Sequence, residues 1–290
     1  MWHTQSAVVT GRGHRLRQLP GQDRTFTLEE NGVTAAALAD GAGSAPMSHE
    51  GAEQAVRAAC RVLCRRFEVF SGPASAFEMR RTVLQAVQEA ICRRAEELGT
   101  RPAALACTLL AVAVKGDRYL LFHVGDGVIG YQKEGVVRVA SRPQNGEFAN
   151  TTTFVTSLDA LSRSRALRGR QPGLEGFVLM SDGCEAALYH KGREKLAPLV
   201  GRLFQRAEFF SHQVSEGQLR AVVEEVIARR TWDDCSLVLV SRRTDTFGRW
   251  EKLSQRERAA VLGIATRNRS RRRRMIRRYG ARYGIKEGGE

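Results

Sequence analysis

Aspartates stand at the ends of four short apolar runs in this chain: Asp40, Asp126 and Asp182 each follow a run, and the pair Asp233-Asp234 precedes one. Each run has the length and apolar character of a buried strand. Because buried strands end at the edges of a sheet, we expect these carboxylates to gather at one edge. Clustered carboxylates repel one another, and hard divalent cations prefer such oxygen-rich sites. The pattern therefore favours a carboxylate-bound Mg²⁺ or Mn²⁺ centre.

Plain turns are the alternative interpretation of these aspartates. Asp-Gly is a turn signal in its own right, because Gly accepts positive φ and Asp bonds to its own backbone. At any single site a turn is the more economical explanation. The joint pattern favours metal binding, because turn aspartates need not flank the most apolar strands and the last pair precedes its strand.

Taken in order, these residues resemble the metal-dependent, type 2C (PPM-type) serine/threonine protein phosphatases, in a bacterial subgroup of that family. The resemblance spans about residues 1–243, and the matching segments are Gln22-Asp23, Ala37–Gly43, Cys107-Thr108, Val124–Gly127, Leu179–Gly183 and Asp233–Val240. It implies an α+β fold, a four-layer α-β-β-α sandwich with two antiparallel sheets flanked by helices. It also implies hydrolysis of phosphoserine and phosphothreonine on protein substrates through a metal-activated water.

The resemblance assigns metal ligands residue by residue. Asp40 matches a carboxylate that bridges two metals, and the Gly41 carbonyl matches a ligand of the second metal. Asp182 and Asp233 match ligands of the first metal and form the expected catalytic set with Asp40. Asp126 matches a ligand of a third, weaker site. Two Mg²⁺ or Mn²⁺ ions would neutralise the phosphate dianion and lower the pKa of a bridging water.

Other positions of the resemblance line the expected site or depart from the pattern. Thr108 and Asp234 match residues beside the metals. The usual Glu-Asp pair reads Gln22-Asp23, and both residues are expected at the metal site. An amide thus replaces a carboxylate in the second metal site, which would weaken it unless Gln22 holds a metal-bound water. The usual phosphate-binding arginine is also missing, because Gln18 occupies its position. Its role passes to a neighbour, and the candidates are Arg17, Arg15 and His14, of which we favour His14.

Composition separates the C-terminus from the rest of the 290-residue chain. Residues 249–290 contain 14 Lys or Arg and four Asp or Glu, a net of +10 out of +15 for the whole chain. We therefore expect a phosphatase domain over 1–246 and a basic C-terminal tail over 247–290, helical or disordered. A cationic helix could bind an acidic protein surface, such as that of a kinase, or nucleic acid. A solvated tail is the alternative.

Cysteine usage and hydropathy indicate a cytoplasmic protein. The six cysteines form no Cys-x-x-Cys pair and are interpreted as core residues in a reducing compartment. No apolar stretch approaches the ~20 residues needed to span a membrane, and the N-terminus lacks a signal-peptide pattern.

Periodicity predicts the elements that would position the site. The expected strands are 3–9, 24–29, 34–39, 106–114, 118–124, 127–132, 136–140, 151–156, 175–181 and 235–241. The expected helices are 49–69, 75–98, 184–189, 195–209 and 215–229. The basic run 163–170 is interpreted as a solvated loop, and residues 185–215 occupy the place of the family's variable flap.

Three functions remain open on the sequence. The first is a protein phosphatase that opposes a kinase. The second is a pseudophosphatase that binds phosphoprotein without turnover, which Gln22 favours and the presence of Asp40, Asp182 and Asp233 opposes. The third is a nucleic-acid-binding regulatory protein that acts through the basic tail.

Overall fold

Two five-stranded antiparallel sheets form the centre of the molecule in a computed structural model, which describes residues 1–72, 75–144, 152–242, 246–263, 269–283 and 285. The first sheet has the order β1 (Trp2–Val9), β12 (Cys235–Arg242), β9 (Leu174–Met180), β6 (Val128–Lys133) and β7 (Val136–Ser141). The second has the order β2 (Arg24–Glu30), β3 (Val33–Ala39), β4 (Leu109–Lys115), β5 (Arg118–Val124) and β8 (Arg165–Arg170).

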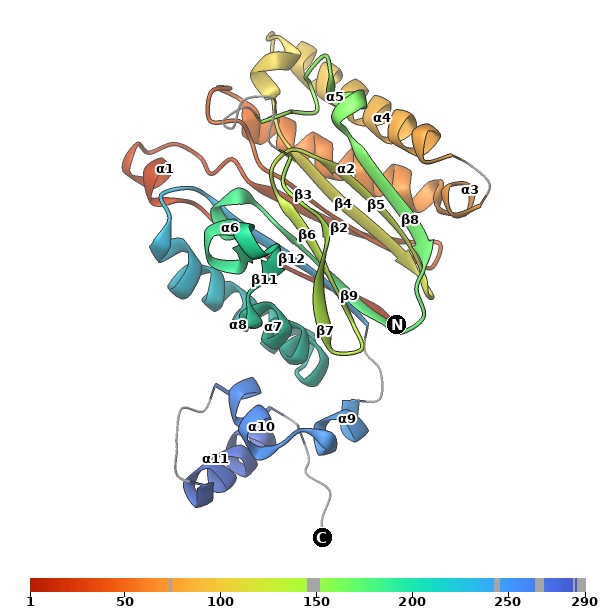
Figure 1. Cartoon of the computed structure of the whole chain (residues 1–290). Coiled ribbons are helices and arrows are strands. Elements are labelled where there is room, and N and C mark those ends of the chain that lie inside the picture. Colours follow the sequence, from red (N-terminus) through yellow and green to blue (C-terminus); the bar gives the residue numbers. More distant parts are fainter. Residues whose placement is uncertain (73–74, 145–151, 243–245, 264–268, 284, 286–290) are drawn as a thin grey trace.

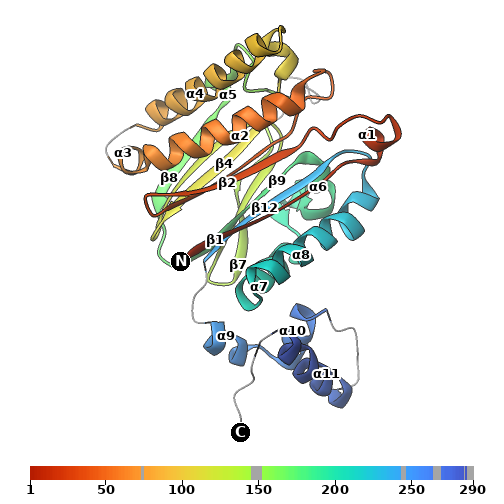
Figure 2. The same cartoon turned by 180° about the vertical axis from the view of Figure 1, so that it is seen from behind.

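Helices cover the outer face of each sheet (Figures 1 and 2). The long helices α2 (Ser48–Arg65) and α4 (Ala76–Glu97) pack on the second sheet, and α7 (Pro198–Phe209) and α8 (His212–Val222) pack on the first. The expected four-layer sandwich is therefore confirmed. Shorter elements are α1 (Arg12–Leu16), α3 (Phe67–Ser71), α5 (Ala160–Arg163), α6 (Asp182–Leu188), and the β10–β11 hairpin (Tyr189–His190 with Lys195–Leu196).

The inner strands, such as β3, are apolar on both faces because each sheet is covered on both sides. In β3, Ala35, Ala37 and Ala39 face the helices α2 and α4, whereas Ala36 and Leu38 face the other sheet. The small alanines let α2 approach the strand closely. This two-sided burial explains why the strand reads as a continuous apolar run rather than an alternating pattern.

Two sequence predictions of secondary structure are wrong. Residues 152–156 of the expected strand 151–156 form no strand, and residue 151 lies outside the described residues. The run 163–170, interpreted as a loop, contains β8 at the edge of the second sheet. Its arginines are compatible with an edge position: Arg168 donates to the carbonyls of Phe70 and Gly72, and Arg170 pairs with Asp117. Charged edge strands discourage pairing with other chains.

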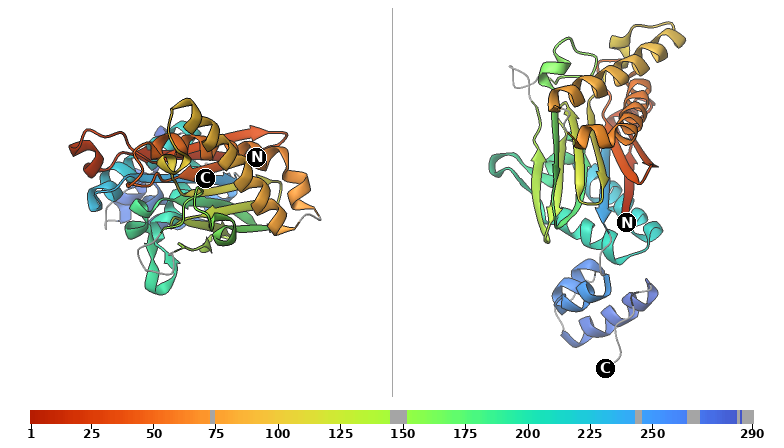
Figure 3. Two further views of the ribbon diagram at one scale, coloured as in Figure 1. Left: turned by 90° about the horizontal axis from the view of Figure 1, so that it is seen from above. Right: turned by 90° about the vertical axis from the view of Figure 1, so that its right-hand side faces the viewer.

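The C-terminal residues form three helices, α9 (Thr246–Lys252), α10 (Gln255–Val261) and α11 (Arg269–Arg282), which we call the C-terminal helical unit. It lies below the end of α7 (Figure 3, right). Its core joins the unit to the sandwich and consists of Phe209, Phe210, Trp250, Ala259, Val261, Leu262 and Ile276. Arg249 also forms ion pairs with Glu175 at 3.0 Å and Glu208 at 3.2 Å. Within the described residues, no helix has the length and hydropathy of a membrane span.

Trp250 is the anchor of this unit, being 1% exposed and in edge-on contact with Phe209 at a ring separation of 5.2 Å. Trp250→Ala is expected to destabilise the unit by about 3 kcal/mol, because a large buried ring leaves a cavity. Chemical unfolding, together with proteolytic cleavage after residue 242, would measure the loss. Phe77→Ala, at a 53% exposed aromatic residue, is the matched control. Equal effects of the two substitutions would contradict this account.

Candidate active site

A pocket of about 180 Å³ opens at the end of the sandwich where the aspartate-bearing strands terminate. Its lining consists of His14, Gln22, Asp40, Gly41, Gly43, Thr108, Asp126, Thr152, Phe154, Asp182 and Asp233. Both sheets contribute, because antiparallel pairing brings the end of one strand beside the start of the next. Thus Asp182 follows β9 where Asp233 precedes β12, and Asp126 follows β5 where Thr108 precedes β4.

Several predicted site residues lie outside this lining. Asp23 and Asp234 are buried at 0% and 2% exposure and are not among the residues of the pocket wall. Arg17 is exposed at the end of α1 and does not line the pocket, whereas His14 of the same helix does. The sequence analysis missed Gly43, Thr152 and Phe154. Thr152 donates a hydrogen bond to Asp126 at 2.6 Å, but its run carried no signal beyond strand propensity.

Backbone contacts fix the turn that carries Asp40. The Asp40 amide donates to the Thr108 hydroxyl at 3.0 Å, and the Thr108 amide donates to the Asp40 carbonyl at 2.8 Å. The turn leaves no space for a side chain at Gly41, because a Cβ there would lie 2.7 Å from the Ser48 hydroxyl and 3.0 Å from Cβ of Gln22. Gly41 is therefore required by close packing.

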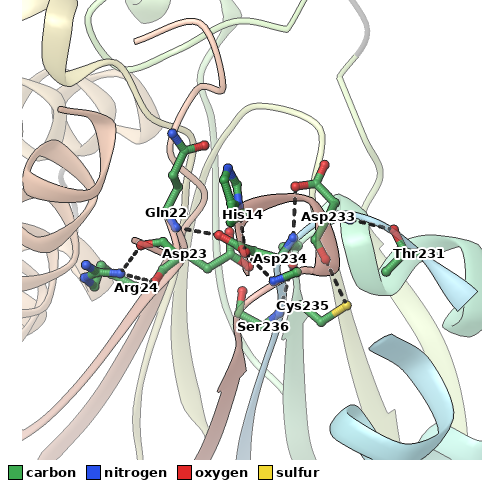
Figure 4. A network of polar contacts seen from close by, with 12 residues as sticks. His14, Gln22, Asp23, Arg24, Thr231, Asp233, Asp234, Cys235 and Ser236 are labelled. Carbon is green, nitrogen blue, oxygen red and sulfur yellow. Dashed lines mark hydrogen bonds and ion pairs between the residues drawn. The ribbon is translucent and has the colours of Figure 1, made fainter. Parts of the chain in front are cut away.

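Asp234 attaches the N-terminal loop to the site (Figure 4). Its carboxylate accepts hydrogen bonds from the amides of Gly11 at 2.6 Å and Gln22 at 2.5 Å, and it contacts Nδ1 of His14 at 2.9 Å. These contacts hold both ends of the loop that presents His14 and Gln22 to the pocket. They also fix the orientation of the His14 ring, as an acceptor on one ring nitrogen does.

His123 supports the turn before Asp126, a role that the sequence analysis did not identify. Its Nε2 lies 2.9 Å from the Gly125 carbonyl and its Nδ1 lies 2.6 Å from the Ser141 hydroxyl. The imidazole thus donates to the carbonyl and accepts from the hydroxyl, which a neutral ring can do. Burial lowers the pKa of His123 to about 3, so the ring is neutral near pH 7.

Burial and mutual repulsion raise the pKa values of three carboxyl groups at the site. Burial raises the pKa of Asp23 to about 7 and that of Asp182 to about 6, with the charges of Asp234 and Asp233, respectively, adding to the rise. The pKa of Asp40 is raised well above its ordinary value by burial and then by the neighbouring charges of Asp23 and Asp182. A positive charge in the pocket would relieve this repulsion.

The donor chemistry of the pocket fits a hard divalent cation. Oδ1 of Asp182 is buried without a hydrogen-bond partner. The lining supplies carboxylate, amide and carbonyl oxygens and no thiol, which is the set that Mg²⁺ and Mn²⁺ prefer. In the described part of the chain, no group of three or more His, Cys, Asp or Glu side chains is arranged as a metal site by itself.

A larger pocket, of about 670 Å³, lies beside the β10–β11 hairpin. It is lined by small, apolar and basic residues and contains no carboxylate, so it offers no comparable chemistry. The smaller pocket is therefore the candidate active site.

Comparisons with known proteins identify the family of this chain. The family model described as protein phosphatase 2C matches residues 10–224. Serine/threonine-protein phosphatase 3 of Escherichia coli (strain K12) is 29% identical over 205 residues, which is 68% of this chain and 75% of that protein.

Solved structures share the fold at low sequence identity. A bacterial serine phosphatase aligns with a TM-score of 0.60 at 15% identity, over 84% of this chain and 99% of its own. PppA, a key regulatory component of T6SS in Pseudomonas aeruginosa, aligns with a TM-score of 0.56 at 19% identity, over 83% and 97%.

Asp182→Asn should make the metal-free protein more stable at alkaline pH than the wild type. Folded wild-type protein retains the Asp182 proton up to about pH 6, whereas the unfolded chain loses it near 3.8. A raised folded pKa contributes stability that is lost as pH rises through this window. The advantage of the variant should therefore grow by about 1 kcal/mol between pH 5 and pH 8.

Urea unfolding with chelator at the two pH values measures this difference. His123 has the opposite pH dependence, but it is present in both proteins and cancels. Asp159→Asn, at an exposed aspartate, is the control and should show no such gain. An Asp182→Asn advantage that is constant or shrinks with pH would contradict the assigned repulsion.

Asp234→Asn should loosen the loop that carries His14 and Gln22. An amide places hydrogen-bond donors against the amides that the carboxylate accepts, which costs about 1–3 kcal/mol locally. Hydrogen exchange at the Gly11 and Gln22 amides should accelerate by tenfold or more, while the β4–β5 amides stay protected. Asp117→Asn, which removes only a surface ion pair with Arg170, is the control. Unchanged exchange at both amides would show that other contacts hold the loop.

Proposed function

The chain belongs to the protein phosphatase 2C family, and from that membership we propose that it hydrolyses phosphoserine and phosphothreonine on protein substrates. The observation that carries the proposal is the convergence of Asp40, Asp182 and Asp233 from three strand ends on one pocket. Enzymes of this family are metal-dependent. A binding protein without turnover would not need three carboxylates in a pocket that meets a phosphate dianion.

We assign the expected cations, two Mg²⁺ or Mn²⁺ ions with a third weaker site, to the oxygens of the pocket. Asp40, Asp182, Asp233 and the Gly41 carbonyl would hold the two principal ions, and Asp126 would hold the third. When bound, such ions neutralise the phosphate and lower the pKa of a bound water. Asp23 lies outside the pocket wall, so in this proposal it acts on Asp40 through charge instead of serving as a direct ligand.

Gln22 lines the pocket where a carboxylate is usual in the resemblance, and its amide supplies one neutral oxygen. The second metal site should therefore be the weaker of the two. Because Asp234 holds the backbone of Gln22, the neutral side chain of Gln22 stays directed at the site.

His14 is the residue that we propose to bind the substrate phosphate. It lines the pocket, and its Nδ1–H donates to Asp234. In the imidazolium form, in which both ring nitrogens carry a proton, Nε2 is then free to donate a hydrogen bond to a phosphate oxygen. Arg17 does not line the pocket and is a weaker candidate for this role. His49, the other histidine near the Asp40 turn, is also outside the lining.

We further propose a cytoplasmic enzyme that opposes a serine/threonine kinase. All six cysteines are free, and five of them are buried, which fits a reducing compartment. The specific phosphoprotein would be selected by surfaces outside the pocket.

Hydrolysis of a phosphothreonine peptide with and without Mn²⁺ tests the proposal. Asp182→Asn and Asp40→Asn are expected to lower kcat by at least 100-fold, because each removes a charged ligand from the site. Gln22→Glu is the informative companion variant: it should retain turnover and reach half-maximal rate at a lower Mn²⁺ concentration. Full activity in excess chelator, or undiminished turnover of Asp182→Asn, would refute the metal-dependent mechanism.

A further inference from the structure

A strongly cationic surface belongs to α11, which takes no part in the candidate active site. This helix of 14 residues contains eight arginines and no acidic residue. It lies at the far end of the C-terminal helical unit in Figures 1 and 2. The pocket residue Asp233 precedes β12, and the chain leaves the opposite end of this strand toward α9.

The helical geometry of α11 places its apolar residues on one side and most of its arginines on the other. Ile276 and the partly buried Met275, Tyr279 and Tyr283 pack into the core shared with α10 and Phe210. At 100° per residue, the opposite half of the helix is formed mainly by exposed arginine side chains, with Ser270 and Ala281 between them. These exposed side chains are Arg271, Arg273, Arg274, Arg277, Arg278 and Arg282. Several also make contacts within the chain, but all six remain exposed.

The regular row of positive charges on this face complements the regular row of phosphates on a nucleic acid. Six charges over about 21 Å of helix correspond to one per roughly 3.5 Å along this face. Duplex DNA carries one negative charge per about 1.7 Å of its axis. A lipid surface is disfavoured because the apolar side of α11, which would insert into a bilayer, is already packed against α10.

The arginines are spread around the helix, and this arrangement fits the groove of a nucleic acid better than a flat binding surface. Side chains that cover about half of the helix circumference can reach phosphates on two sides at once. The major groove of B-DNA is about 12 Å wide and admits an α-helix between its two phosphate backbones. The corresponding groove of A-form RNA is too narrow for side chains to enter.

We propose that the arginine face of α11 binds double-stranded DNA in the major groove through phosphate contacts on both walls. The binding is independent of sequence and does not occlude the phosphatase pocket, which lies beyond the other end of β12. Phosphate contacts of this kind release condensed counterions and make affinity strongly dependent on salt.

Fluorescence anisotropy of the full-length protein with a 20-base-pair DNA duplex tests the proposal. With six phosphate contacts, affinity should fall about 10³-fold between 50 and 200 mM NaCl. The triple variant Arg274→Gln, Arg278→Gln, Arg282→Gln should bind more weakly at every salt concentration. It should also lose only about 40-fold over the same range, because each contact contributes about 0.9 to the slope.

Two matched variants distinguish the effect of the α11 arginines from the effect of the protein's net charge. The control variant Arg61→Gln, Arg81→Gln, Arg93→Gln removes the same charge from exposed positions on α2 and α4 and should bind as the wild type does. The Lys version of the α11 triple variant keeps the charge and should retain affinity within about threefold, because Lys also binds phosphate as a point charge. Equal thermal unfolding midpoints verify that all variants are folded.

Several outcomes would overturn the proposal. The first is no binding to the duplex at 50 mM NaCl. The second is equal weakening by the α11 and control variants, which would mean that only net charge matters. The third is binding of an RNA duplex as tightly as DNA, or equal competition by polyglutamate, which would indicate an RNA or an acidic protein partner instead. Inhibition of p-nitrophenyl phosphate turnover by bound DNA would refute the claim that the pocket stays open.

Discussion

Buried carboxyl groups repel one another at one end of the sandwich, where water cannot screen their charges. The structure of this end of the molecule depends on that repulsion. Asp40 lies near Asp23 and Asp182, and burial raises the pKa of each. Such groups stay together only if their backbones cannot move apart. The hydrogen bonds between the strands supply that restraint. Glycine permits the close approach of the backbones, because a Cβ at Gly183 would lie 2.0 Å from the Asp234 carbonyl oxygen. The layers of helix and sheet therefore stabilise an arrangement that the metal-free site opposes.

The main features of the fold could be read from the sequence because they are expressed in local patterns. The run Thr34–Ala39 is a buried strand in the structure, and the turn after it brings Asp40 to the sheet edge. The strand β8 was not predicted, because its arginines are typical of a solvent-exposed loop. In an edge strand such side chains can point into solvent or donate to nearby backbone carbonyls. His123 also escaped, because a lone histidine in an apolar strand gives no sign of the turn that it supports.

The placement of buried neighbours around the site could not be predicted either, because it depends on contacts between distant segments. Nothing near Asp234 in the sequence indicates that it holds the loop from Gly11 to Gln22. The C-terminal unit shows the same limit. Its charge was evident from composition, but the core around Trp250 depends on Phe209 and Phe210, which precede it by about 40 residues. The short apolar segments between the arginines of this unit do not indicate in the sequence that they form a core together with α7.

The pairing of β1 has a consequence for the synthesis of this protein on the ribosome. β1 lies at the edge of its sheet and has β12 as its strand neighbour, and the amide of Gly11 meets Asp234 across 223 residues. At roughly 5–20 residues per second, this N-terminal segment waits about 10–45 s for its partner to be translated. During that time a nascent chain carries an unpaired strand and an incomplete pocket, which exposes it to misassembly. The enzyme can become active only when translation of its sandwich is nearly finished, so premature hydrolysis by unfinished chains is prevented by topology alone.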